Sequence, residues 1–279
     1  MKEITTDTII NTVEKLAIDA CYHLGSDVKD LLEDAHKSET SPFGVNILEQ
    51  LLENIKVSAE VQLPLCQDTG MAVVFLELGQ DVHITGGSLY DAVNEGIRRG
   101  YKKGYMRKSV LDPLLRQNTG DNTPAVIHTE ITAGDNLKIT VAPKGFGSEN
   151  MSRLAMLPPS AGIEGVKNFI LETVTKAGAN PCPPIILGVG IGGTMEKASL
   201  IAKKALLRRA GTKNADPNIA MLEQEMLDRI NQTGIGPQGL GGRTTALAVH
   251  IETYPTHIAG LPVAVNIQCH AARHAEAVL

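Results

Sequence analysis

Apolar and polar positions follow a helical period over about the first 60 residues of the chain. In the segment TIINTVEKLAIDACYHLG, residues 8–25, apolar side chains recur at three- and four-residue steps on one face: Ile10, Val13, Ala17, Cys21 and Leu24. This spacing predicts an amphipathic helix that ends at Gly25. A further amphipathic helix is predicted over VNILEQLLENIKV, residues 45–57.

After residue 70 the pattern changes to short apolar runs that are typical of strands. Strands are predicted over MAVVFLEL (71–78) and DVHIT (81–85), and a helix over residues 86–105. The runs AVIHTEIT (125–132) and NLKITVAP (136–143) predict a β-hairpin, because Ala133, Gly134 and Asp135 form a short connection between them.

The second half of the chain alternates helical and strand patterns. Helices are predicted over residues 165–178, 196–211 and 217–234, and strands over residues 184–193, 244–253 and 260–269. Asp216 followed by Pro217 gives the helix at 217 a cap and a favourable first turn. No linker or repeat divides the chain, so we expect one α/β domain over residues 1–279 with mixed sheets flanked by helices and a helical N-terminal segment. The length leaves room for two closely packed subdomains.

Composition narrows the class of protein. With 43% hydrophobic and 20% charged residues, the 279-residue chain has the make-up of an ordinary globular protein. A net charge of -5, no Trp and 3% aromatic residues argue against nucleic-acid binding. The N-terminus lacks a signal-peptide pattern, and no apolar stretch approaches the ~20 residues of a membrane span, so we expect a cytoplasmic protein without a membrane partner.

The four cysteines are therefore expected to be reduced. Cys21 lies in the predicted helical stripe, which indicates a small packed side chain. Cys66, Cys182 and Cys269 lie at strand boundaries, and no CxxC pair is present, which argues against a zinc finger. Three thiolates on rigid turns would suit an iron–sulfur cluster with one iron lacking a protein ligand, while inert buried thiols fit the spacing equally well.

Three glycine-rich loops follow or precede predicted strands. In GVGIGGT (188–194), Gly188, Gly190 and Gly193 fit the GxGxxG pattern, but the acidic residue that a dinucleotide fold needs after the next strand is missing. This loop, KGFGSEN (144–150) and QGLGGRTTA (238–246) could each bind a small anion or simply allow close packing. The side chain of Arg243 in the last loop could donate hydrogen bonds to a bound carboxylate if it pointed inward.

A basic run, RRGYKKGYMRKS, occupies residues 98–109. The first four basic residues fit a solvated helix face: Arg98, Arg99, Lys102 and Lys103. Arg107 lies beyond the predicted helix in a loop, where a guanidinium could bind a substrate carboxylate.

Five motifs, taken together and in order, resemble those of a known family. They are LPLCQDTG (63–70), KGFGSENMS (144–152), ANPCPPIILGVGIGGTMEKASLIAKKALLR (179–208), GLGGRTTALAVHIE (239–252) and THIAGLPVAVNIQCHAARHA (256–275). The sequence resembles the iron–sulfur hydro-lyases, class I fumarase and L(+)-tartrate dehydratase, in the form of the α subunit of the two-subunit enzymes. The resemblance covers nearly the whole chain.

This resemblance implies a 4Fe–4S cluster held by Cys66, Cys182 and Cys269, with the open iron acting as a Lewis acid. Carried over by position, Gln67 and Asp68 face the substrate, and Asp68 is a candidate acid/base group. Arg107 matches the arginine that holds a substrate carboxylate, Gly145 a backbone contact, and His257 a substrate-binding and catalytic histidine. Thr69 and Gly70 are expected to shape the turn that carries Cys66.

The resemblance also implies partners and a reaction. The substrate is a small dicarboxylate, with fumarate and L-malate favoured on overall likeness and L(+)-tartrate as the alternative. The chain ends ten residues after Cys269, and a separate β subunit is expected to complete the site in an α2β2 assembly, so that the α chain alone is inactive. The remaining alternatives are a non-catalytic iron–sulfur binding protein and a nucleotide-dependent α/β enzyme that uses the GVGIGG loop.

Overall fold

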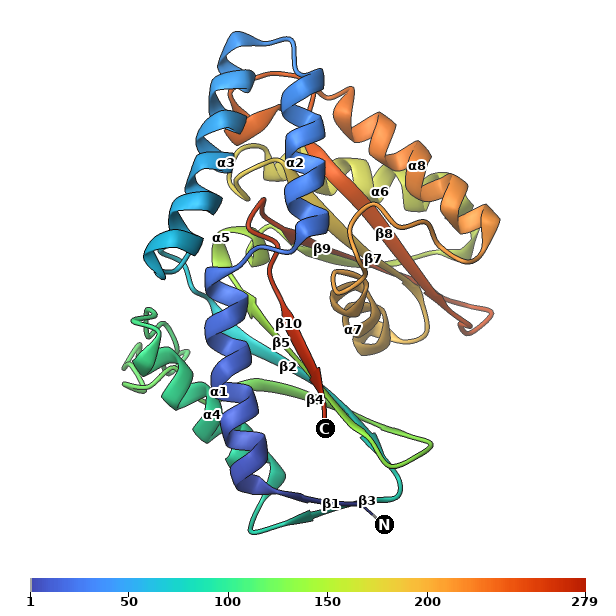
Figure 1. Cartoon of the computed structure of the whole chain (residues 1–279). Coiled ribbons are helices and arrows are strands. Elements are labelled where there is room, and N and C mark those ends of the chain that lie inside the picture. Colours follow the sequence, from blue (N-terminus) through green and yellow to red (C-terminus); the bar gives the residue numbers. More distant parts are fainter. Residues whose placement is uncertain (1) are drawn as a thin grey trace. The chain divides into compact units, whose positions relative to one another are not determined.

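A computed structural model describes residues 2–279, and the chain in it forms two compact units that each combine distant segments. Unit 1 contains the described residues up to Leu24, together with Asn54–Phe146 and Arg273–Leu279. Unit 2 contains Gly25–Glu53 and Gly147–Ala272. Helices and mixed sheets occur in both, which confirms the predicted α/β class (Figure 1).

Unit 1 is built on a four-stranded sheet in the order β10-β5-β2-β4. These strands are β10 (Ala275–Val278), β5 (Leu137–Lys144), β2 (Met71–Gly79) and β4 (Val126–Thr132). β2 runs parallel to β4 and antiparallel to β5, and β10 pairs with β5. A small parallel pair is formed by β1 (Lys2–Thr5) and β3 (Val82–Thr85).

The predicted hairpin between residues 125–132 and 136–143 is wrong, although both strands exist. β4 and β5 do not pair, because β2 lies between them and bonds to both. β2 is almost continuously apolar, with Ala72, Val73, Val74, Phe75 and Leu76 all buried. A strand of that composition belongs in the middle of a sheet, where both faces are covered.

Two helices, α1 (Thr6–Tyr22) and α4 (Leu89–Lys103), pack together in unit 1 (Figure 1). Their close approach depends on Gly96, where an added Cβ would lie 2.6 Å from the Cβ atom of Val13. The predicted stripe is largely confirmed: Val13, Ala17 and Cys21 are fully buried, while the helix stops before Leu24.

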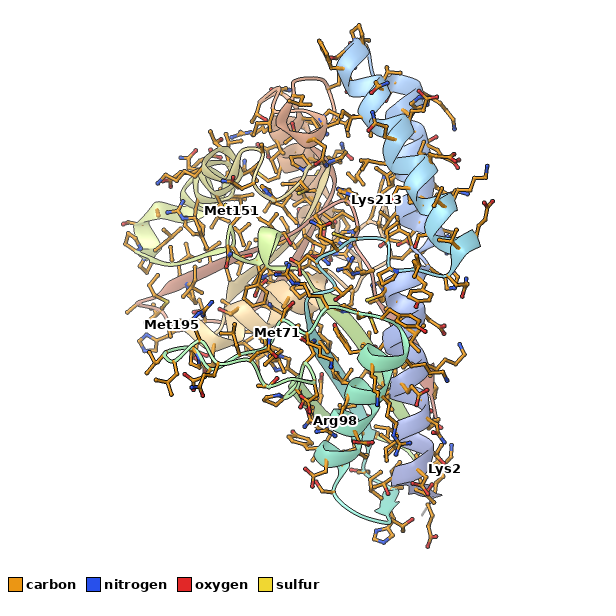
Figure 2. The ribbon with its side chains drawn as sticks, turned by 90° about the vertical axis from the view of Figure 1, so that its left-hand side faces the viewer. Lys2, Met71, Arg98, Met151, Met195 and Lys213 are labelled. Atoms are coloured by element: carbon orange, nitrogen blue, oxygen red, sulfur yellow. The ribbon has the colours of Figure 1, made fainter. Side chains whose placement is uncertain are left out.

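Of the four basic side chains of α4, Arg98, Arg99 and Lys103 pair with acidic side chains at the protein surface, as expected of a solvated face. Arg98, labelled in Figure 2, donates from Nε to the Asp121 carboxylate at 2.7 Å and also contacts Glu95. Arg99 donates to Glu95, and Lys103 pairs with Glu14 of α1 at 2.9 Å.

Unit 2 contains a second four-stranded sheet in the order β6-β9-β7-β8. The strands are β6 (Arg153–Leu157), β9 (Leu261–Gln268), β7 (Ile185–Gly192) and β8 (Ala246–Tyr254). β7 and β8 are parallel, whereas β9 runs antiparallel to both β6 and β7. Figure 1 shows α6 (Gly162–Ala177) and α8 (Pro217–Asn231) on one face of this sheet and α7 (Met195–Ala205) on the other.

The remaining elements are a helix of unit 2, α2 (Ser26–Ser38), the long helix α3 (Pro42–Val61) and short turns. The chain passes from one unit to the other four times: after Leu24, within α3, within the single turn α5 (Phe146–Glu149) and after Ala272. Two 3-10 turns cover Pro159–Ala161 and Pro237–Gly239. The Asp216 side chain accepts from the Asn218 N–H at 2.8 Å, which confirms the predicted cap of α8. Within residues 2–279, none of the helices is both long enough and apolar enough to cross a bilayer.

The glycines of GVGIGGT serve close packing between β7 and α7. Gly188 and Gly190 lie inside β7, and a Cβ atom would come within 2.0 Å of the Ala202 carbonyl oxygen and 2.1 Å of that of Ala198. Their partners on the helix are therefore backbone atoms, which cannot move away as a flexible side chain would. Of the two interpretations of this loop, close packing is the one that the structure supports.

Candidate functional site

The turn between α3 and β2 carries Cys66 and Gln67. The Leu65 N–H donates to the Cys21 carbonyl at 2.9 Å, and the Asn54 side chain donates to the Leu65 carbonyl at 2.9 Å. Cys66 is half-buried and Gln67 is exposed, and the Cys66 thiol lies 3.4 Å from the Gln67 amide oxygen. The turn is thus fastened just before the two side chains that the sequence singles out.

Asp68 joins this turn to the loop that contains Gly145. Its carboxylate accepts from the Gly70 N–H at 3.0 Å and from the Phe146 N–H at 2.8 Å. A Cβ atom on Gly145 would lie only 3.1 Å from the Asp68 carboxylate, so the bare backbone allows this approach. The buried Arg273 donates to the Asp68 carbonyl. Asp68 and Gly145 are therefore neighbours in the fold.

Thr69 connects the same turn to Arg107. Its hydroxyl accepts from the Arg107 N–H at 2.9 Å and donates to the Arg107 carbonyl at 3.3 Å. Thr69 is 2% exposed, whereas the side chain of Arg107 is exposed. The backbone of Arg107 is thereby fixed at the turn while its guanidinium stays accessible.

Two buried residues that the sequence analysis did not identify complete the turn. The Tyr101 hydroxyl donates to the Thr69 carbonyl at 2.8 Å and contacts the Gly70 carbonyl at 3.2 Å. The Asn122 amide donates to the Gly70 carbonyl at 3.1 Å. Both side chains are fully buried and bond to backbone, and no local sequence signal marks such long-range contacts.

The second unit places Cys182 and Cys269 at one end of its sheet. Cys182 precedes β7, Cys269 follows β9, and these strands are antiparallel with Ile186 opposite Gln268. Cys182 is exposed and has a positive φ of 55°, while Cys269 is half-buried.

His270, which the sequence analysis did not select, connects these two segments. Its backbone N–H donates to the Cys182 carbonyl at 3.4 Å. Its ring atom Nδ1 lies 3.0 Å from the same carbonyl oxygen and 3.3 Å from the side-chain nitrogen of Gln238. The Gln238 side chain donates to the neighbouring Pro183 carbonyl at 2.8 Å.

His257 lies at the opposite end of the same sheet. It is exposed in the connection between β8 and β9, and its Nδ1 accepts from the Ala259 N–H at 3.1 Å. The 8 residues of β9 separate this connection from Cys269, a span of about 23 Å along the strand. The structure does not bring His257 next to Cys182 or Cys269 of its own unit.

The loop QGLGGRTTA has its N–H groups bonded to a carboxylate of the chain itself. Glu39, which is 7% exposed, accepts from the Arg243 N–H at 2.8 Å and from the Thr244 N–H at 3.3 Å. A Cβ atom on Gly242 would lie 2.8 Å from the Glu39 carboxylate. The Arg243 side chain is exposed. These N–H groups thus bind Glu39, as the Phe146 N–H of the Gly145 loop binds Asp68.

The thiols divide into one buried group and three accessible ones. Cys21 is fully buried, and burial raises the pKa of its thiol to about 11, so it remains protonated. Cys66, Cys182 and Cys269 are accessible cysteines on turns, and thiolates are the ligands that an iron–sulfur cluster uses. Within either unit, taken over residues 2–279, no three His, Cys, Asp or Glu side chains group as metal ligands.

A family profile and individual relatives point to the same family for this chain. The profile described as "Fumarate hydratase (Fumerase)" matches residues 10–278. The chain is 45% identical over 273 residues to the putative L(+)-tartrate dehydratase subunit alpha of Methanocaldococcus jannaschii, covering 96% of both chains. It is 34% identical over 251 residues to the L(+)-tartrate dehydratase subunit alpha of Escherichia coli K12, covering 88% of this chain and 82% of that protein. The chain therefore belongs to the fumarate hydratase family and is a hydro-lyase.

Proposed function

We propose that this chain is the α subunit of a 4Fe–4S hydro-lyase that reversibly hydrates fumarate to L-malate. The observation that carries the proposal is the turn at residues 65–70. Its Cys66 and Gln67 are accessible, while Asp68 and Thr69 fasten the Gly145 loop and Arg107 to it.

The proposed cluster ligands are Cys66, Cys182 and Cys269. They are the accessible thiols of the chain, and each follows or precedes a strand on a turn held by backbone hydrogen bonds. When bound, a cluster with three protein ligands supplies one Lewis-acidic iron, which favours removal or addition of a substrate hydroxyl. Cys21 has no place in this set because it is enclosed in the core of unit 1.

The side chains around the turn would bind and orient the dicarboxylate. The guanidinium of Arg107 can donate two parallel hydrogen bonds to one carboxylate, and its backbone is held in place by Thr69. Gln67 offers an amide to the substrate, and Gly145 allows the backbone to approach it closely. Asp68 is the proposed proton carrier, since its carboxylate lies beside Gly145.

The position of His257 supports an assembly that contains two copies of the chain. If His257 contacts the substrate near Cys269, it cannot do so in its own unit, because the length of β9 lies between them. A second copy of the chain would supply it, in keeping with an α2β2 assembly. Co-expression of a His257→Ala chain with a Cys182→Ala chain, both with the β subunit, tests this point. Activity restored in the mixture but absent from each variant alone supports sharing, and no restoration refutes it.

Dehydration of L(+)-tartrate is the second candidate function. The observation in its favour is that relatives at 45% and 34% identity carry the name L(+)-tartrate dehydratase subunit alpha. Tartrate has one more hydroxyl than malate, and a site that hydrogen-bonds this group can discriminate strongly. Comparison of kcat/KM for L-malate and L(+)-tartrate with the assembled enzyme decides between the two.

The first test is the iron and acid-labile sulfide content of the chain purified without oxygen. The proposal predicts close to four of each per chain. Cys182→Ala should lose them, whereas the matched control Cys21→Ala should keep them. Equal contents in both variants, or none in the native chain after reconstitution, would refute the cluster.

The second test is activity. The α chain alone should be inactive, and addition of a β subunit should give fumarate hydration that is lost on exposure to oxygen. A cluster-loaded assembly that hydrates no dicarboxylate would instead favour the non-catalytic iron–sulfur protein.

A further inference from the structure

We propose that residues 112–117, which we call the leucine loop, dock the β subunit through Leu114 and Leu115. The inference rests on the proposed function, since it assigns a surface to the partner that completes the site. It begins from exposure: Leu114 is 87% and Leu115 72% exposed, so neither side chain contributes to the core of unit 1. Large apolar side chains displayed together in this way mark interaction surfaces.

The leucine loop is rigidly held. The Asp112 carboxylate accepts from the Leu114 N–H at 2.9 Å and from the Leu115 N–H at 2.6 Å. The Asp112 backbone bonds to Gln117 at 2.8 Å and to Arg116 at 3.0 Å, which closes the loop on itself. A loop fixed in this way loses little conformational entropy when it binds a partner.

The base of the leucine loop is equally well anchored. Leu111 forms a β-bridge with Asn118, whose side chain donates to the Lys108 carbonyl at 2.9 Å. The buried Asn122 side chain accepts from the N–H groups of Ser109 and Val110. The exposed leucines therefore occupy a fixed position relative to the rest of unit 1.

Continuity with the proposed site identifies the partner. Arg107 lies five residues before Asp112 in the same segment, which Figure 1 shows in green after α4. Tyr105, two residues before Arg107, is 84% exposed. A subunit that completes a site at Arg107 must approach this segment, and Tyr and Arg are the residues that most often dominate binding interfaces. A relative that this chain matches over 96% of its length carries the name subunit alpha.

Charge defines the chemistry of the partner surface. Lys108 and Arg116 are exposed and positive, whereas the carboxylate of Asp112 is already bonded to the loop backbone. The matching surface on the β subunit is an apolar pocket with an acidic rim. Two leucines bury too little apolar area for stable membrane attachment, which favours a protein partner over a lipid surface.

The test measures capture of the co-expressed β subunit by the tagged α chain. The Leu114→Ser/Leu115→Ser double variant should bind at least about tenfold more weakly, because it removes two central apolar contacts. Asp112→Ala, which keeps both leucines but frees the loop, should show a smaller loss. The matched control is Ile131→Ser, which removes a side chain that is 74% exposed on β4, and it should bind the β subunit as the native chain does.

Iron content and thermal unfolding of the α chain separate docking from folding and from the proposed function. Unchanged iron and melting temperature with lost capture supports the docking surface. Normal capture by the double variant overturns it, even if hydration of fumarate is confirmed. Three other results would overturn it as well. One is an equal loss of β-subunit capture in Ile131→Ser. The others are a double variant that changes only self-association of the α chain, and one that loses only binding to vesicles of anionic phospholipid. A native assembly that forms but contains no iron and has no activity would instead refute the proposed function.

Discussion

Replacing Glu39 tests whether a buried carboxylate holds the glycine-rich loop of unit 2. Its Oε1 accepts from the Thr40 N–H at 2.9 Å and the Ser41 N–H at 3.0 Å, and its Oε2 from Arg243 and Thr244. Glu39→Ala would leave these N–H groups without their acceptor in a site that is 7% exposed. Loss of this single side chain should therefore weaken both the α2–α3 connection and the loop.

The expected cost follows from the number and type of bonds. A hydrogen bond to a charged group contributes about 1.5–3 kcal/mol, but bonds that share one acceptor are not additive and water can replace some of them. We expect Glu39→Ala to lower the free energy of unfolding by about 3–5 kcal/mol. Glu39→Gln keeps one acceptor oxygen but turns an N–H₂ group toward N–H donors. It should therefore lower the free energy of unfolding by about 2–3 kcal/mol.

The pH dependence of this contribution has a definite sign. Burial raises the pKa of Glu39, but the hydrogen bonds from Ser41, Thr40, Arg243 and Thr244 outweigh it and lower the pKa below its ordinary value of 4.5. A lowered pKa means that the folded chain binds the proton less well than the unfolded chain. The stabilisation is complete above the unfolded-state pKa and is lost as the pH falls through the folded-state pKa.

Urea unfolding followed by circular dichroism measures the total effect. Hydrogen exchange of the segment around residues 238–246 reports the loop separately, which matters because a chain of two units need not unfold in one step. The matched control is Glu49→Ala, an exposed glutamate on α3. The reasoning is refuted if Glu39→Ala stays within about 0.5 kcal/mol of that control and exchange of the loop is unchanged.

Three further predictions concern packing, pH and positioning. Gly188→Ala should lower the free energy of unfolding by at least about 3 kcal/mol, because its Cβ would lie 2.0 Å from the Ala202 carbonyl oxygen. The control is Gly260→Ala, whose Cβ would have nothing within 4 Å. Equal midpoints of urea unfolding for the two variants would contradict the packing argument. Burial and the Arg208 charge lower the pKa of His250 from 6.5, despite the Ala205 carbonyl and the Glu223 and Asp27 carboxylates. The folded chain should therefore lose stability as the pH falls below about 6.5. A His250→Met chain whose free energy of unfolding falls as much between pH 7 and 5 as that of the native chain would disprove this. Thr69→Val removes the hydroxyl that holds the Arg107 backbone. It should raise KM for the dicarboxylate about tenfold with a smaller change in kcat, whereas Thr69→Ser should keep the native KM. Loss of kcat at an unchanged KM would show that Thr69 has another role.

Local features were predictable from the sequence because neighbouring residues determine them. The cap at Asp216 and the burial of Cys21 depend on helical geometry alone, and both are found in the structure. The position of Cys66 just before a strand was predictable from the apolar run that begins at Met71. For Thr69, the expectation that it shapes this turn holds, and its bond to Arg107 extends it.

Long-range relations could not be predicted in this way. The hairpin prediction failed because insertion of β2 between β4 and β5 depends on burial in a sheet, not on the Ala133–Asp135 connection. Glu39 and Arg243 are 204 residues apart in sequence, so nothing local marked the carboxylate that occupies the loop. The separation of His257 from Cys269 likewise follows from the length of β9 and becomes visible only in the fold.

The last strand of unit 1 has a consequence for synthesis on the ribosome. β10 pairs with β5, and Leu279 exchanges backbone hydrogen bonds with Leu137. The sheet that supports the Cys66 turn is therefore incomplete until residues 275–278 have left the exit tunnel, whereas Gly147–Ala272 of unit 2 have already been made. Until then β5 has an unpaired edge, which is a site for aggregation. A nascent chain stalled near residue 270 should need chaperones, and a bulky fusion directly after Leu279 should lower the soluble yield.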